Sequence, residues 1–213
     1  MFLPPQEHIE RLYEAFSVEV KPVRIDGCPC CLDRKEICKL VNTSLRQITP
    51  EDLGSYASSV FLTVGSEEDF RYFLPRILEI LVTTSGWWPD PEVVGRAIGT
   101  VGWTSFSPAE QKAIQGFFDV TITSLIESTE VDGYNIDSWL CCASHIIPGW
   151  GQYLDSVTVR ATALLALYGC HSDSLARGRL GNGFWDDSPK KQAYLSWLTS
   201  EDTKAQIQEA YGL

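Results

Sequence analysis

The chain has 213 residues, of which 44% are hydrophobic and 11% aromatic, so it can bury a sizeable core and is not predicted to be disordered. It carries 17 Lys and Arg against 28 Asp and Glu, which gives a formal net charge of −11. This acidic balance disfavours direct binding to nucleic-acid phosphates and to anionic membrane surfaces, and it is compatible with a basic protein partner.

The start of the chain, residues 1–5, has neither the basic residues nor the apolar stretch of a secretory signal. No apolar run approaches the roughly 20 residues that a membrane-spanning helix needs. We therefore expect a cytoplasmic protein. In that compartment its seven cysteines are expected to be thiols or metal ligands and not disulfides.

Helix signals recur along the whole chain. Ile9, Leu12, Tyr13 and Phe16 repeat at helical spacing and predict a first helix over 6–16. Further helices are predicted over 32–40, 49–61, 66–81, 90–101, 107–128, 136–146, 158–170, 188–198 and 201–210.

Two of these regions carry special signals. Thr49-Pro50 followed by acids is a strong helix start, because Thr can cap, Pro suits the first turn and acids favour the positive end of the helix dipole. Pro75 falls inside a helical pattern and predicts a kink or a break. The stretch 178–187, rich in Gly and Asp, predicts a loop.

About nine helices with short connections, and few strand alternations, predict an all-α protein. We expect one domain over 1–213, built as an irregular helical array for which HEAT-like pairs are one candidate form. The starts at 49–50, 90–91 and 107–108 recur, but the residues that follow them do not align.

The most distinctive string is Gly27-Cys28-Pro29-Cys30-Cys31, with Cys38 seven residues further on. Thiolates are ligands for soft metals, and Cys28 and Cys31 have the spacing found in zinc knuckles. No second pair follows nearby, so three interpretations stay open. They are a zinc site made by Cys28, Cys30, Cys31 and Cys38, a redox pair, and a tight turn with buried thiols that needs no cofactor.

A second group of metal-ligating residue types lies in the other half of the chain: Cys141, Cys142, His145, Cys170 and His171. Helical spacing can bring members of this group together, but small core residues explain the cysteines more simply. The chain has no Gly-x-Ser-x-Gly elbow and no phosphate-binding glycine loop. We therefore assign no catalytic residue.

Seven tryptophans occur, several of them in predicted loops or at helix ends. Trp and Tyr are common anchors of protein interfaces, and they are also ordinary core residues at helix junctions. We predict partner binding by Trp87, Trp88 and Trp185. Trp185 is singled out because Asp186 and Asp187 follow it, and an aromatic ring beside acids suits a basic partner.

The turn at 27–31, the segment 45–53 and the segment 69–79 (Asp-Phe-Arg-Tyr-Phe-Leu-Pro-Arg-Ile-Leu-Glu) together resemble a group of uncharacterised bacterial proteins of similar length. The resemblance covers roughly the first half of the chain. It implies a bacterial origin and brings no established activity.

Three functions follow as hypotheses. The first is a non-catalytic binding protein, specifically an immunity-type inhibitor that neutralises a basic toxin. The second is a zinc-stabilised structural or adaptor protein that uses the Cys28–Cys38 region. The third is a helical enzyme of unknown substrate built around His145 or His171.

Overall fold

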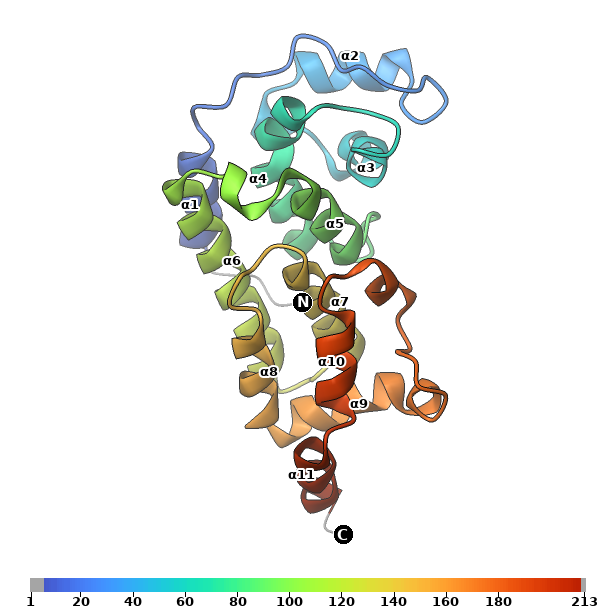
Figure 1. The fold of residues 1–213 in the computed structure, drawn as a ribbon. Helices are drawn as coiled ribbons and strands as arrows, with labels where there is room; N and C mark the ends of the chain where they lie inside the picture. Colours follow the sequence, from blue (N-terminus) through green and yellow to red (C-terminus); the bar gives the residue numbers. More distant parts are fainter. Residues whose placement is uncertain (1–5, 212–213) are drawn as a thin grey trace. The chain divides into compact units, whose positions relative to one another are not determined.

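The computed structural model describes residues 6–211, where regular secondary structure is helical and is accompanied by two isolated β-bridges (Figure 1). By packing, the chain divides into two compact units, Met1–Phe117 and Phe118–Leu213, where the sequence led us to expect one domain. The boundary lies within helix α6 (Pro108–Glu127), and each unit has its own buried apolar residues. In the part of the chain described, no helix is both long and apolar enough to cross a membrane.

The first unit is built around α4, which packs against α1, α3 and α5. Its helices begin where local capping signals predict. Thr49 accepts a hydrogen bond from the Asp52 amide at the start of α3, and Ser66 and Asp69 form a capping box at the start of α4. The elements of this unit are α1 (Gln6–Ala15), α2 (Arg34–Asn42), η1 (Leu45–Gln47), α3 (Pro50–Ser59), α4 (Glu67–Thr83), α5 (Pro91–Val101) and η2 (Trp103–Ser105).

Pro75 predicted a kink or a break, and the break is not present, because helix α4 continues through Pro75. Proline in a helix interior removes one backbone hydrogen bond and disfavours the helix by about 3 kcal/mol. Leu74, Ile77 and Leu78 beside it are completely buried. Burial of this apolar face outweighs the local penalty, because each such side chain contributes about 1.5–3 kcal/mol.

The second unit is organised by α9, which packs against α7, α8 and α11. Helix α8 follows Pro148 and Gly149 and was not predicted, since these residues signal a loop. The apolar residues Trp150, Tyr153, Leu154 and Val157 nevertheless repeat at helical spacing there, and all are buried. The elements are α7 (Gly133–Ser144), α8 (Gly151–Thr158), α9 (Ala161–Leu175), η3 (Gly183–Asp187), α10 (Lys191–Leu198) and α11 (Glu201–Tyr211).

The all-α prediction is confirmed. Residues 6–211 contain eleven α-helices where about nine were expected. The contacts of the two central helices, α4 and α9, do not follow a common pairwise pattern, so a HEAT-like repeat is not shown.

Gly27 holds the cysteine-containing turn against the segment that precedes α4. It forms an isolated β-bridge with Val64, the Cys28 amide donates to the Thr63 carbonyl at 2.9 Å, and the Gly65 amide donates to the Asp26 carbonyl at 2.8 Å. A Cβ atom on Gly27 would lie 2.6 Å from Cγ1 and 2.8 Å from Cα of Val64. Only glycine permits this approach of the two backbones.

Replacing Gly27 with Ala should therefore lower the free energy of unfolding by about 1–3 kcal/mol, because the methyl group must displace Val64. Gly169→Ala is the matched control, since it lies in α9 at an exposed position where a new Cβ meets no heavy atom. That change should raise stability by up to about 1 kcal/mol. Urea unfolding followed by circular dichroism measures both changes, and effects of the same sign would contradict the close approach.

Candidate functional site

Three of the four predicted metal-ligating cysteines come together. The sulfur atoms of Cys28, Cys30 and Cys31 lie within 4.8 Å of one another, a group that could hold a metal ion. Cys28 Sγ lies 2.6 Å from Cys30 Sγ, and Cys30 Sγ lies 3.8 Å from Cys31 Sγ. Cys38 is not a member of this group. It lies on α2, where its sulfur accepts a hydrogen bond from Asn42 at 3.3 Å.

The turn that carries these thiols is anchored at both ends. Its first residue, Cys28, is tied to Thr63 by the backbone bond described above. The amides of Cys31 and Leu32 donate back to the Cys28 carbonyl at 3.0 and 3.1 Å, which closes the turn. Leu32 is buried and Asp33 caps α2, so the backbone is fixed while the thiols stay at least partly accessible to solvent.

The thiols influence one another electrostatically. The Cys30 side chain hydrogen-bonds to the Cys28 sulfur and lowers the pKa of Cys28 below its usual value. The same interaction raises the pKa of Cys30 to about 11, because Cys30 keeps the proton that the pair shares. The turn thus combines one thiol that ionises readily with one that is a hydrogen-bond donor.

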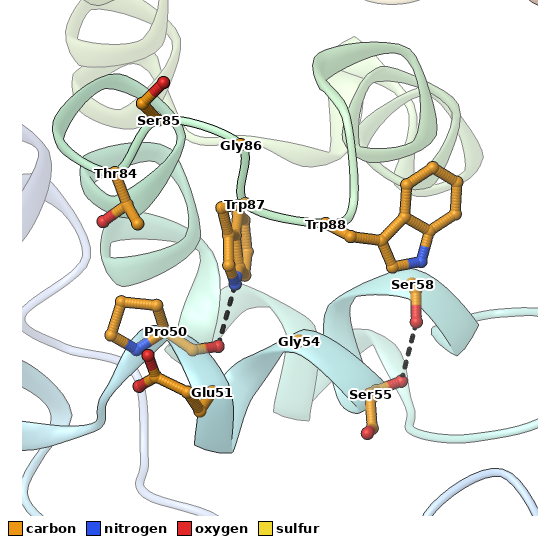
Figure 2. Close-up of a pocket in the computed structure, with 10 residues that line it drawn as sticks. All are labelled: Pro50, Glu51, Gly54, Ser55, Ser58, Thr84, Ser85, Gly86, Trp87 and Trp88. Atoms are coloured by element: carbon orange, nitrogen blue, oxygen red, sulfur yellow. Dashed lines mark hydrogen bonds between the residues drawn. The ribbon is translucent and has the colours of Figure 1, made fainter.

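The pair Trp87 and Trp88 lines an open hollow in the first unit, with a volume of about 440 Å³, between the start of α3 and residues 84–88. Trp87 donates its ring N–H to the Pro50 carbonyl at 2.8 Å, and Figure 2 shows Trp88 turned away from that bond. Trp88 is 55% exposed. Gly54 lets the segment lie on α3, since a Cβ there would be 3.1 Å from the Trp88 carbonyl. Trp87 is therefore an anchor and Trp88 an accessible ring.

The hollow and the cysteine turn are connected through α2. Glu36 accepts the Asp33 amide at 2.8 Å, which completes the capping box at the end of the turn. Its other oxygen accepts the Ser55 hydroxyl at 2.7 Å, and Ser55 lines the hollow. One carboxylate thus binds both to the cap of the turn and to the wall of the hollow.

Trp185 does not lie on a surface, and that prediction is wrong. Its ring is fully buried, stacks on Tyr194 with centroids 4.0 Å apart, and donates its N–H to Asp137 at 2.9 Å. The neighbouring acids are accessible, as predicted. Asp186 is 71% exposed at its side chain and lies 2.7 Å from Lys191, and Asp187 is exposed as well. The short η3 helix directs the ring inward and the carboxylates outward, an alternation that the sequence does not reveal.

Buried Asp137 collects the side chains around Trp185. Its Oδ1 accepts from Trp185, His171 and Tyr194, each at 2.9 Å, and its Oδ2 accepts from Asn182 at 2.8 Å. Burial and this carboxylate raise the pKa of Tyr194 well above its usual value. Sequence reasoning missed Asp137. The sequence did contain a signal for it, because Asp137 is an acidic residue on a helix, α7, whose other residues are mostly apolar and buried.

His171 has no ring nitrogen left for a substrate. Its Nδ1 accepts the Gly181 amide at 2.9 Å, so Nε2 carries the proton that is donated to Asp137, and the side chain is buried. This arrangement supports a structural role and weakens the hypothesis of an enzyme built on His171.

The second predicted group of cysteines and histidines is mostly core. Cys141 and Cys142 are completely buried, and Cys170 donates to the Ala166 carbonyl at 3.3 Å. Burial raises the pKa of Cys170 to about 11. Among the described residues, the cysteine turn at 28–31 is the one group of three or more His, Cys, Asp and Glu side chains close enough together to share an ion.

No protein-family model matches the chain, and neither a curated protein nor a solved structure shows significant similarity to it.

Asp137→Ala should lower the free energy of unfolding by at least about 3 kcal/mol, because three buried donors and the half-buried Asn182 amide lose their acceptor. The matched control is Asp173→Ala, an exposed acid on α9, which should change stability by less than about 0.5 kcal/mol. Thermal unfolding of both variants, followed by circular dichroism, measures the change. A loss no larger than that of the control would mean that the hydrogen bonds to Asp137 do not stabilise the second unit.

Proposed function

We propose that this protein binds a basic protein partner in the cytoplasm and does not act as a catalyst. Its specific role would be that of an immunity-type inhibitor that neutralises a toxin. The observation that carries the proposal is the half-exposed Trp88 beside the open hollow, held in position by the anchored Trp87. Rigid, accessible tryptophans are typical centres of binding energy in protein interfaces.

Charge supports a partner of opposite sign. The net charge of −11 attracts basic proteins over long range and speeds their association at low salt. At the hollow, Glu51 lies exposed on the first turn of α3. In the second unit, Asp186 and Asp187 form a separate exposed acidic element without Trp185. The proposal therefore depends on Trp88 and Glu51, and Trp185 is no longer part of the binding surface.

The test begins with a partner that co-purifies from the host of this protein at low salt and arrests growth when it is expressed alone. Against that purified partner, Trp88→Ala should weaken binding at least tenfold, or about 1.4 kcal/mol, because the ring would be desolvated at the interface. Tyr134→Ala removes an aromatic residue of the other unit that is more exposed than Trp88, 71% against 55%, and should change affinity less than twofold. Moderate salt should weaken the wild-type complex.

Two results would contradict the proposal. The first is unchanged affinity in Trp88→Ala with the toxic partner, and the second is a partner whose toxicity the wild-type protein does not relieve on co-expression. Trp185→Ala is unsuitable as a probe of the surface, because it removes a buried ring and a hydrogen bond to Asp137.

A second candidate function is that of a zinc-stabilised adaptor, and the grouping of Cys28, Cys30 and Cys31 is the observation that favours it. Zinc bound in the folded state stabilises a protein by mass action. If this function is right, the purified protein should retain zinc through dialysis, and a chelator should lower the melting temperature of the wild type but not that of Cys31→Ser. Equal melting curves with and without chelator would contradict it.

A further inference from the structure

The three grouped thiols lie on one four-residue turn, and no fourth ligand joins them. Within residues 6–211, no other His, Cys, Asp or Glu side chain offers a ligand atom close enough to be part of the group. Closed structural zinc sites have four protein ligands, whereas sites with three leave one position to water or to another molecule. The turn therefore differs from a zinc knuckle, which is completed by a second pair of ligands.

We infer that this turn binds one Zn²⁺ through the thiolates of Cys28, Cys30 and Cys31 and leaves the fourth coordination position open. This inference rests on the zinc candidate above and goes beyond it, because it excludes Cys38 as a ligand. An open position makes the ion accessible to an exogenous donor such as water or a thiol.

Binding is a proton exchange and not a redox step. Three S–H bonds break, three Zn–S bonds form at about 2.3 Å, and up to three protons pass to solvent, fewer where a thiol is already ionised. One water of the hydrated ion stays on the fourth position. The product carries a single negative charge, which the accessible location of the turn allows water to solvate.

The geometry needs one adjustment. Two sulfurs bound to the same tetrahedral zinc lie about 3.8 Å apart, because each is about 2.3 Å from the ion. The Cys30–Cys31 pair is already 3.8 Å apart, whereas the Cys28–Cys30 pair is 2.6 Å apart and must open. Cys30 is exposed, so rotation of its side chain can open the pair while the backbone bonds of the turn stay in place.

Cys38 lies within α2 and outside the group of three sulfurs. The α2 capping box, formed by Asp33 and Glu36, separates it from the turn, and its own side chain contacts Asn42 within α2. Cys38 therefore provides a matched control, an exposed cysteine seven residues from Cys31 that does not belong to the site.

The test is titration of the reduced full-length chain with Zn²⁺ alone, and with Cd²⁺ as a probe whose thiolate absorption counts bound sulfurs. We expect one equivalent to bind, with X-ray absorption showing three sulfur ligands and one oxygen or nitrogen ligand. Cys28→Ser and Cys31→Ser should each weaken binding at least a hundredfold. Cys38→Ser should bind within threefold of wild type and keep the same absorption. Circular dichroism checks that every variant is folded.

Each contrary result has a distinct meaning. Four sulfur ligands, with Cys38→Ser as weak as Cys31→Ser, would overturn the open-site inference while the zinc-adaptor function survives. No binding by the reduced, folded chain would overturn both. Formation of a disulfide within the turn under air, with no zinc bound by the reduced form, would overturn both and assign the turn to redox chemistry.

Discussion

A carboxylate is buried at a tolerable free-energy cost only where hydrogen-bond donors of the protein replace the water that it loses. Buried Asp137 therefore requires several segments of the second unit to bring donors to it. Its donors come from α9, from the η3 region and from α10, so these segments have to converge on α7. The stretch between α9 and α10 has little regular structure, yet it is fixed by side-chain hydrogen bonds to one acid. Buried hydrogen bonds of this kind select one arrangement of the segments, whereas apolar contacts alone would allow several arrangements of similar free energy.

Sequence reasoning succeeded where the determinants are local. Thr49 and Ser66 mark helix starts because a cap acts within three residues, and both caps are present in the structure. It failed where distant residues decide the outcome. Helix α4 continues through Pro75 because its face is buried, and Trp185 turns inward because Asp137, 48 positions earlier, accepts its N–H. An adjacent pair of acids suggested a surface, although consecutive side chains in a short helix point in different directions.

The candidate site shows the same division. The spacing of Cys28 and Cys31 predicted that thiols would meet, and they do, because a turn of this length closes on itself. Whether Cys38 would join them depended on the path of the backbone between residues 31 and 38, which the spacing of the cysteines does not encode. The hollow at Trp88 depended on Gly54, which permits a loop from 34 residues later to lie on α3. Neither feature has a signature in a single sequence.

Glu36, whose two oxygens bind the Asp33 amide and the Ser55 hydroxyl, links the turn to the wall of the hollow by direct hydrogen bonds. If an ion in the turn changes the geometry of this carboxylate, it changes the free energy of whatever occupies the hollow. Reciprocity then requires the occupant of the hollow to change the affinity for the ion by the same factor. A single carboxylate is enough to link the two places, because each of its oxygens is bound at one of them.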